Sequence, residues 1–434
     1  MLNAYASVVA LLCSCACVVA QEVAAPSVDA LVSTAVTRIE AMQSKGPGGD
    51  VVAEWPYEGV YRVGGDIPYA YRVGGTSITG LALLEAPGLA QSPERNAALI
   101  RAVEFVVQSP DEPLMSFDPA VYRGGYDVRN WGHCYGLRFL LRAKSTLKLS
   151  PELTLKVDRA MQFFLEALKK TEIPTVGGWQ YARKSGIENV SDMSPFMTAP
   201  CLEALLEAKA AGLEISPELL ERTCSDMSPF MTAPCLEALL EAKAAGLEIS
   251  AELLERTCAA LELCRGASGY VAYGTAKPIR DQEQQIPGAM GRMCATEVAL
   301  AKAGKQDNAR LRFAVEAFFK HWEELEKRRK KQGTHLAPYG VAPYYFYYAH
   351  LYAAEAIALL PAAEQPELAE RFLATLLKSR DTDGTWNDRV FPRSAAYSSA
   401  MSVLALLDIK SALPVGRPAK AATSTPALAP NVSR

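Results

Sequence analysis

Apolar residues recur at helical spacing along most of the chain, and no segment alternates apolar and polar positions as a half-buried strand would. In the segment 367–380, for example, Phe372, Leu373, Leu376 and Leu377 form one apolar stripe. The same pattern predicts helices at 95–109, 156–170, 251–265 and 308–331. The hydrophobic pattern therefore predicts an all-α protein.

A second set of predicted helices, richer in small residues, alternates with the first. Each follows a turn of glycine and aromatic residues, and these turns lie near 71–76, 124–126, 177–181, 269–270, 338–340 and 383–386. The helices that follow them are predicted at 77–86, 130–143, 194–212, 287–304, 344–360 and 395–407. The turns are about 45–70 residues apart, which is enough for two helices in each unit.

Residues 191–224 and 225–258 are the same segment written twice, and they differ only by Pro217 in the first copy and Ala251 in the second. With either copy deleted, the chain reads as one ordinary unit between neighbouring turns. The length of the duplicate is therefore not the period of the fold, and we reject a tetratricopeptide array.

The first copy ends in a short helix, 217–224, that lacks the apolar continuation found after the second copy. A helix of about two turns is shorter than its neighbours in the array. We therefore expect either that one copy packs with the other units while the other copy bulges out, or that the ring is strained at this point. The residues then expected to be under-buried are Leu202, Leu205, Leu206 and Leu213, or their copies.

The first residues contain an apolar run, Val8 to Ala20, that ends in small residues. Such a run is typical of a signal peptide and is too short for a typical membrane-spanning helix. We expect residues 1–20 to be a signal peptide, 21–44 a helical lead-in, 45–410 the repeat domain and 411–434 a disordered tail rich in Ala, Pro, Ser and Thr. The mature protein is then expected to be exported, as a periplasmic, secreted or envelope-associated protein without a transmembrane segment.

Charge and cysteine content exclude several classes of function. The net charge is −3, so no nucleic acid partner is indicated. The cysteines that belong to neither the leader nor the second copy are Cys134, Cys201, Cys224, Cys264 and Cys294. They lie on apolar helical segments without CxxC pairs, so we expect buried thiols rather than a disulfide framework or a metal site.

The segment 376–386, LLKSRDTDGTW, resembles a degenerate QW motif of squalene and terpene cyclases, and GGWQY at 177–181 and GGY at 124–126 resemble the same turn. Over about 45–410 the chain is similar to the prenyltransferase/squalene-cyclase repeat family. With its leader, it looks like the exported members of that family in planctomycete-type bacteria. The resemblance implies an α/α toroid, with concentric inner and outer helices in about six hairpins and the duplicated unit inserted.

The chemistry of that family is not evident in the chain. There is no DxDD motif, and the nearest string, Asp381-Thr382-Asp383-Gly384, is expected to make turn hydrogen bonds. His133 and Cys134 are adjacent on a predicted helix and point about 100° apart, which is awkward for binding one zinc ion. We therefore expect no metal and no cofactor.

The aromatic residues of the turns are the remaining clue to function. They either pack on neighbouring turns or line a central cavity for an apolar or sugar-like ligand. The candidate cavity residues are Trp55, Tyr57, Tyr126, Trp131, His133, Trp179, Tyr181, Tyr270, Tyr344, Tyr345 and Trp386. Glu58 and Asp281 are the candidate catalytic carboxylates, although no spacing in the chain picks out a pair.

The expected function is an exported scaffold that binds a ligand or a protein partner without cyclase or prenyltransferase chemistry. The alternative is a terpenoid cyclase-like or carbohydrate-active enzyme that uses unrecognised carboxylates in the central cavity. A purely structural repeat protein is the third possibility.

Overall fold

The computed structural model describes residues 26–46, 49–124, 126–173, 177–181, 194–222, 229–273 and 281–413. The expected signal peptide and nearly all of the expected tail lie outside these residues. Within them the chain is helical apart from one hairpin of two strands, β1 (Ser44–Gly46) and β2 (Gly49–Glu54). The all-α prediction is confirmed, and none of the helices in these ranges is long and apolar enough to cross a membrane.

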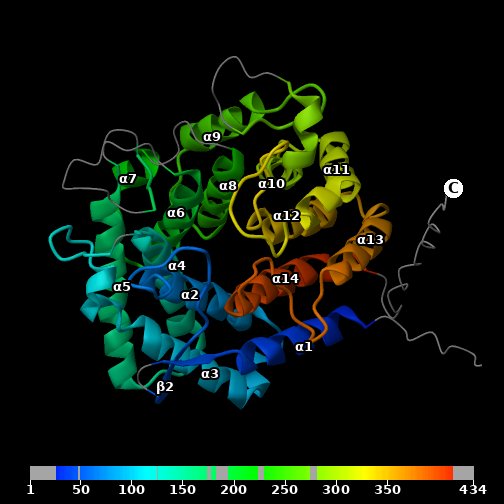
Figure 1. Ribbon diagram of the computed structural model, residues 1–434. Helices are drawn as coiled ribbons and strands as arrows, with labels where there is room; N and C mark the ends of the chain where they lie inside the picture. The colour runs from blue at the N-terminus through cyan, green and yellow to red at the C-terminus, as the bar shows by residue number, and fades with distance from the viewer. Residues whose placement is uncertain are drawn as a thin grey trace, which may run out of the picture.

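Seven helices form an inner ring in the described part of the chain (Figure 1). They are α2 (Tyr69–Glu85), α4 (Arg129–Thr146), α6 (Pro195–Ala210), α8 (Pro229–Ala244), α10 (Met290–Lys302), α12 (Tyr345–Leu359) and α14 (Ala395–Lys410). Each packs against the next in chain order, and α14 packs against α2. The last contact closes the ring.

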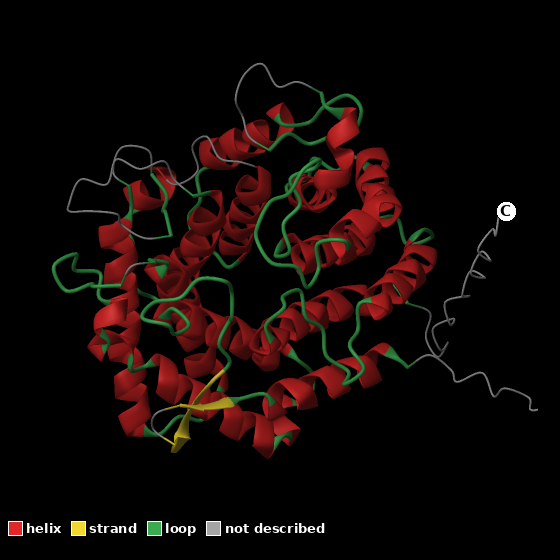
Figure 2. Ribbon diagram, viewed as in Figure 1, coloured by secondary structure: helices red, strands yellow, loops and turns green. Residues whose placement is uncertain are grey.

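The other seven helices lie outside this ring (Figure 2). They are α1 (Val28–Ala41), α3 (Pro93–Val106), α5 (Pro151–Thr171), α7 (Pro217–Arg222), α9 (Ala251–Leu263), α11 (Asn308–Glu326) and α13 (Gln365–Lys378). Short 3₁₀ turns occur at Leu89–Gln91, Ser109–Asp111, Pro113–Met115, Glu283–Gly288 and Pro392–Ser394. The fold is thus an α/α toroid, with the six expected hairpins and one more supplied by the duplicate.

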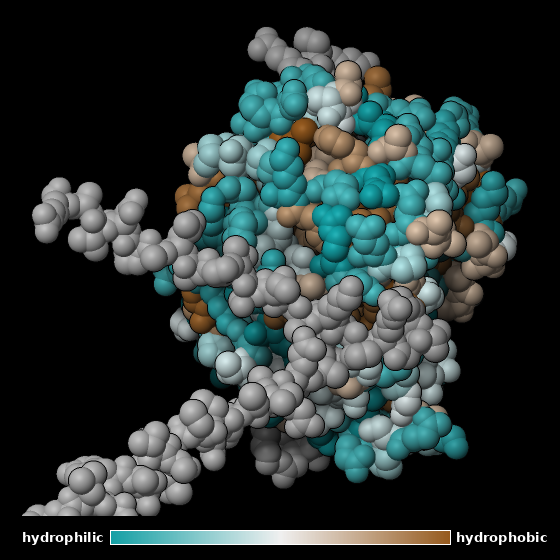
Figure 3. All heavy atoms as spheres, turned by 90° about the vertical axis from the view of Figure 1, so that its right-hand side faces the viewer, coloured by the Kyte–Doolittle hydropathy of each residue, from teal (hydrophilic) through white to brown (hydrophobic). Residues whose placement is uncertain are grey.

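The outer helices pack by apolar stripes and begin at strong caps. Ser92, Ser150 and Ser250 each accept a backbone N–H of the helix that follows, which satisfies a donor that the first turn leaves unpaired. The outward faces remain polar, and the side of the molecule near α11 and α13 is mostly hydrophilic with hydrophobic side chains between (Figure 3). Helix α1, from the expected lead-in, packs against α14 and so covers the point where the ring closes.

Small residues bring the inner helices together. A Cβ atom added to Gly80 of α2 would lie 2.4 Å from the ring of Phe139 on α4, and one added to Gly74 would lie 2.3 Å from Trp131. Real Cβ contacts are longer than this, so the two helices can approach only because these positions carry no side chain. The Gly- and Ala-rich pattern of the inner helices therefore reflects close helix packing.

A repeated tryptophan contact, here called the tryptophan clamp, ties the outer layer to the inner layer. In three turns an indole N–H donates to a carbonyl in the last turn of the outer helix, and the same residue's backbone N–H donates to a hydroxyl on the inner helix. The indole bonds are Trp55 to Ile39 (2.7 Å), Trp179 to Leu168 (2.8 Å) and Trp386 to Leu376 (3.1 Å). The backbone bonds are Trp55 to Thr76 (2.9 Å), Trp179 to Thr198 (3.1 Å) and Trp386 to Ser399 (3.0 Å).

The expectation that one copy of the duplicate bulges out is wrong. Helices α6 and α8 are the two copies of one sequence, and both lie in the inner ring between α4 and α10. Leu202 and Leu205 are fully buried, and so are their copies Leu236 and Leu239. Leu206 is also buried, whereas its copy Leu240 and the pair Leu213 and Leu247 are half-buried. Both copies therefore pack most of the apolar face that was expected to be exposed on one of them.

The short helix α7 explains how the extra unit fits. It has only six residues, yet it buries Leu219 and Leu220 at 5% and 3% exposure. The Arg256 guanidinium on α9 also donates to the Glu221 carbonyl of α7. In Figure 1, α7 lies on the outside of the ring between α5 and α9, so a reduced outer helix is enough to cover the added inner one.

We predict that Leu205→Ala and Leu239→Ala each lower the free energy of unfolding by about 2–5 kcal/mol, because each removes a fully buried side chain. Urea unfolding of the two variants measures both values. Leu155→Ala is the control, since Leu155 is 71% exposed and its loss should cost little. A large cost for only one of the two buried leucines would restore the bulged arrangement.

Candidate functional site

A cleft of about 480 Å³ opens where the first and last hairpins of the toroid meet. Its walls come from the connection between α1 and α2, with Trp55 and Pro56, and from the connection between α13 and α14, with Asn387 and Arg389. The volume is within the range of sites that hold small ligands.

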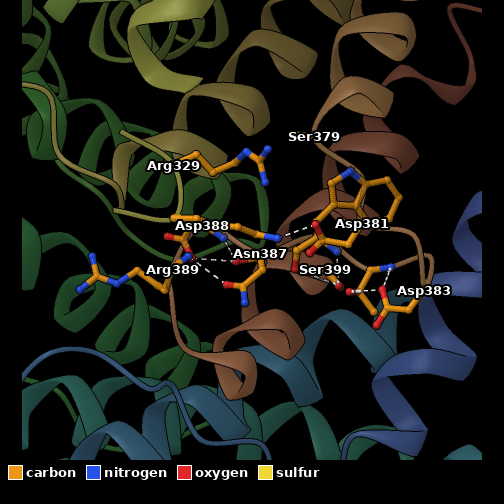
Figure 4. Close-up of polar contacts among 12 residues, drawn as sticks. Arg329, Ser379, Asp381, Asp383, Asn387, Asp388, Arg389 and Ser399 are labelled. Atoms are coloured by element: carbon orange, nitrogen blue, oxygen red, sulfur yellow. Dashed lines mark hydrogen bonds and ion pairs between the residues drawn. The ribbon is translucent and has the colours of Figure 1, made fainter. Parts of the chain in front are cut away.

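The loop before α14 is fixed by hydrogen bonds on several sides (Figure 4). The Ser398 hydroxyl on α14 donates to the Asp388 carboxylate at 2.9 Å and lies 3.1 Å from the Asp388 backbone N–H, which donates to it. The Arg389 backbone N–H donates to the Asn387 side chain at 2.9 Å. The Lys330 backbone N–H donates to the Asp388 carbonyl at 2.8 Å. The loop thus presents Asp388 and Arg389 in fixed positions.

Arg389 is a buried cation with an unused donor. The residue is 5% exposed, and its Nη1 has no hydrogen-bond partner among the described residues. Its guanidinium lies beside Gly59, near the rings of Tyr57 and Tyr71. In Figure 4 the side chain extends away from Asn387 and Asp383. A buried guanidinium N–H without an acceptor costs folding free energy. An oxygen atom of a bound ligand would satisfy this donor.

Asp388 is the second unusual group of the loop. It is 1% exposed, and its Oδ2 has no partner in the part of the chain that the structure describes. Burial raises the pKa of this carboxyl to about 6. Asp388 can therefore hold a proton in weakly acidic solution, which an exposed aspartate would not do.

Aromatic side chains from several turns meet near Arg389 and form what we call the tyrosine collar. Its members are Tyr57, Tyr61, Tyr71, Tyr126, Trp131, Tyr181, Tyr344 and Tyr397. Tyr57 lies in edge contact with Tyr71 and Tyr397, at centroid distances of 5.5 and 5.0 Å. Tyr61 stacks on Tyr126 at 3.9 Å. The residues belong to the N-terminal ends of α2, α4, α12 and α14 and to the turns before α2, α4 and α6.

The phenols of Tyr181 and Tyr344 in the collar are neutral over the ordinary pH range. Burial raises the pKa of Tyr181, and the nearby phenol of Tyr344 raises it further. Burial also raises the pKa of Tyr344 to about 12. The collar therefore offers aromatic faces and neutral hydroxyl groups, which suit a hydroxyl-rich ligand.

Five of the predicted cavity residues lie in this collar, namely Tyr57, Tyr126, Trp131, Tyr181 and Tyr344. Tyr345 lies beside them and bonds to His335 at 2.7 Å. Trp55 borders the cleft, but Trp179 and Trp386 are fully buried in tryptophan clamps between the two layers. Tyr270 is 5% exposed and lies against Arg292.

His133 is placed in the core and not at a metal site. Its Nε2 lies 2.9 Å from the Met115 carbonyl oxygen and its Nδ1 lies 3.3 Å from the Asn130 side-chain oxygen. Burial lowers its pKa to about 3, so the ring is neutral. The described residues contain no group of three His, Cys, Asp or Glu side chains that could hold a metal ion, and their cysteines are free and buried.

The two candidate catalytic carboxylates lie apart in different turns. Glu58 pairs with Arg62 at 2.8 Å. Asp281 accepts the Ser268 backbone N–H at 2.7 Å and its hydroxyl at 2.5 Å, and these bonds lower the pKa of Asp281. Each carboxylate is thus held by local partners in its own loop.

Sequence reasoning missed a group of charged residues at the opposite, C-terminal end of the inner helices, here called the charge ring. Its members are Glu85, Arg138, Arg142, Glu203, Glu207, Glu237, Glu241, Lys302, Glu355 and Asp408, and every inner helix supplies at least one. Arg138 pairs with Glu203 and Glu207, and Lys302 pairs with Glu237 and Glu355.

These charges face one another across the centre of the toroid. Glu355 on α12 is among the charges that raise the pKa of Glu203 on α6, although the two helices are not neighbours. Glu241 on α8 acts in the same way on Glu85 of α2. Burial, the largest cause, raises the pKa of Glu203 to about 7, that of Asp408 to about 7 and that of Glu237 to about 8. The sequence signal was a charged residue near the end of each otherwise apolar inner helix.

Comparisons with known proteins show only that the fold of this chain is similar to folds already solved. No protein-family model matches the chain, and no curated protein matches it. Among solved structures it is similar to the Lin0763 protein of Listeria innocua, with 12% identity, a TM-score of 0.44 and coverage of 89% of this chain and 97% of the other. It is also similar to an inactive variant of the α-1,6-mannanase GH76A of Salegentibacter sp. HEL1_6 in complex with α-1,6-mannotetrose. That similarity has 9% identity, a TM-score of 0.45 and coverage of 89% of this chain and 100% of the other. Similarities at this level establish neither an activity nor a ligand.

The raised pKa values predict how stability changes with pH. A carboxyl whose pKa is higher in the folded protein than in the unfolded chain stabilises the fold while it is protonated, and this stabilisation is lost as the pH rises through the folded value. For Glu237 the loss should occur between about pH 4.5 and 8. We predict that Glu237→Gln, which keeps a neutral side chain of the same size, is more stable than the native protein at pH 8.5 by on the order of 2 kcal/mol.

Urea unfolding at several pH values measures this difference, which should shrink toward pH 5. Glu252→Gln on the exposed face of α9 is the control and should show no such trend. A stability difference between Glu237→Gln and the native protein that is the same at pH 5 and pH 8.5 would contradict the assignment.

Proposed function

We propose that this protein binds a carbohydrate-type ligand in the cleft at the mouth of the toroid. Arg389 is the polar anchor of the site. The tyrosine collar does not line the cleft itself but adjoins it at the Arg389 guanidinium, and we propose it as the neighbouring stacking surface. The observation that carries the proposal is the unpartnered Nη1 of Arg389, a buried residue that lies between the cleft of about 480 Å³ and the tyrosine collar.

The chemistry of the cleft favours a sugar over an apolar ligand. A sugar offers C–H faces to aromatic rings and hydroxyl oxygens to the Arg389 N–H groups, whereas a hydrocarbon would leave those donors unpaired at a cost of about 1–3 kcal/mol each. Three of the other charged groups at the cleft already have partners, and Arg393 is exposed. Asp381 is paired with Lys330 at 2.5 Å, and Asp383 accepts the Thr385 hydroxyl at 2.7 Å.

A carbohydrate-active enzyme is the second candidate, and one observation favours it. Asp388 is buried beside the collar, has a free carboxylate oxygen and has a pKa raised to about 6, which are properties of a general acid. Release of reducing ends from oligosaccharides by the native protein, with loss of that activity in Asp388→Asn, would decide for the enzyme. Binding without turnover would decide for the scaffold.

Export and family relationship are further parts of the proposal. The apolar leader supports secretion through a cut after Ala20, and the tryptophan clamps of the QW-like turns support a relationship to the prenyltransferase/squalene-cyclase repeat proteins. Cyclase and prenyltransferase chemistry are not proposed. N-terminal sequencing of the protein from cell envelopes tests the cut, and a mature chain that begins at Met1 would refute export through this leader.

We predict that Arg389→Ala weakens binding of the best-bound oligosaccharide at least about tenfold, as expected for loss of a charged hydrogen bond of 1.5–3 kcal/mol. Isothermal titration calorimetry with a panel of neutral and uronate-containing oligosaccharides measures the affinities. Arg159→Ala is the matched control, because this arginine is 63% exposed on α5, away from the mouth. Absence of binding across the panel, or unchanged affinity in Arg389→Ala, would refute the proposal.

A further inference from the structure

The charge ring contains more carboxylates than its basic groups can pair. It has seven carboxylates, on α2, α6, α8, α12 and α14, against three basic groups, on α4 and α10. Ion pairs with Arg138 and Lys302 engage Glu203, Glu207, Glu237 and Glu355. The seven inner helices also point their C-terminal ends toward this side, and each adds a partial negative charge. The ring is therefore a region of negative potential inside the protein.

One carboxylate of the ring has an oxygen with no partner. The Glu237 side chain is only 9% exposed, and its Oε2 is bound by Lys302. Its Oε1 has no hydrogen-bond partner among the described residues. Glu207 on the adjacent inner helix α6 likewise has an unpartnered Oε2. Two buried acceptors on neighbouring helices thus lack a donor at the centre of the molecule.

Lys302 shows which kind of donor the ring accommodates. Its ammonium group bridges Glu237 on α8 and Glu355 on α12, so two carboxylates from different helices lie within about 6 Å of each other, the sum of two hydrogen-bond lengths. Aromatic rings lie beside these carboxylates. Glu237 is the main charge that acts on both Tyr348 and Tyr352, whose ring centroids are 4.8 Å apart. Carboxylates with adjacent aromatic faces suit an ammonium ion.

We propose that the charge ring binds an organic cation with two or more ammonium groups, of the polyamine class. One ammonium group of this ligand bonds to the free oxygen of Glu237, on the side of the carboxylate that Lys302 does not occupy, and the free oxygen of Glu207 accepts from the same cation. Another is held by the remaining carboxylates of the ring, at Glu241, Glu85 or Asp408. A metal ion fits less well, since the described residues form no cluster of three metal-ligating side chains.

This site is separate from the cleft at the mouth and does not depend on the function proposed there. It does depend on the duplicated segment. Glu237 and Glu241 come from the second copy and repeat Glu203 and Glu207 of the first. The duplication therefore added two carboxylates to the ring, and one of them, Glu237, is one of the two whose side chains have an unpartnered oxygen.

Binding of the cation must compete with protons. Burial raises the pKa of Glu203, Glu237 and Asp408 above the ordinary range, so part of the ring is protonated at neutral pH. The other titratable or charged groups that face these carboxyls are Glu85, Tyr135, Arg138, Arg142, Glu207, Glu241, Lys302, Tyr348, Tyr352 and Glu355. The pKa values of the three tyrosines, Arg138 and Lys302 are raised, so these groups keep their charge state between pH 6 and 8.5. The affinity for the cation therefore rises over this range as Glu203, Glu237 and Asp408 ionise.

The test is isothermal titration calorimetry of the whole protein with spermidine at pH 6.0 and pH 8.5 and at constant ionic strength. We expect saturable binding at pH 8.5 that is at least about tenfold weaker at pH 6.0. Glu237→Gln and Glu207→Gln should each weaken binding at pH 8.5 by at least about fivefold, and the matched control Glu252→Gln should not. Both variants keep side-chain size, and circular dichroism checks that they fold.

Three results would overturn the proposal. The first is an absence of saturable binding of spermidine at pH 8.5. The second is equal affinity in the native protein and in both glutamine variants. The third is an equal effect of MgCl₂ or NaCl at the same ionic strength, which would show general screening of charge instead of a site.

Discussion

Closure of the inner ring by the contact of α14 with α2 is the constraint on which the rest of the structure depends. In a closed ring each inner helix has neighbours on both sides and an outer helix behind it, so its remaining face is turned to the centre. The N-terminal ends of the inner helices bring the tyrosine collar and Arg389 together, and their C-terminal ends bring the charge ring together. Helix α1 packs on α14 and holds the first and last units at the closure, next to the cleft.

Much of the fold follows from local sequence. Helical periodicity, serine caps and glycine-aromatic turns predict the helix pairs, and the turn tryptophans indicate the repeated connection between layers. Their role is structural, because Trp179 and Trp386 are fully buried and hydrogen-bonded on both sides. The collar residues Tyr57, Tyr126 and Trp131 were predicted as cavity residues for their place in the turns, and the structure brings these three together.

The parts that could not be predicted depend on contacts between distant segments. Glu355 and Asp408 look like ordinary polar residues near the ends of helices, and only ring closure turns them toward carboxylates on other helices. The local sequence does not distinguish Arg389 from other residues in turns. Its burial depends on Gly59, which is more than 300 residues earlier in the chain and lies beside its guanidinium. The copies of the duplicate could not be placed because their apolar face fits any inner position. The short α7 follows the first copy as its reduced outer helix, and α9 packs against the second.

A crystal structure of the protein tests the central claim most directly, namely that both copies of the duplicate belong to one closed ring that places Arg389 at its mouth. The ring predicted here should give electron density for Pro195–Ala210 and Pro229–Ala244 as adjacent inner helices, for α14 against α2, and for Arg389 Nη1 without an acceptor from the protein. Density that places either copy outside the ring, or that pairs Arg389 Nη1 with an acceptor of the protein, would contradict it.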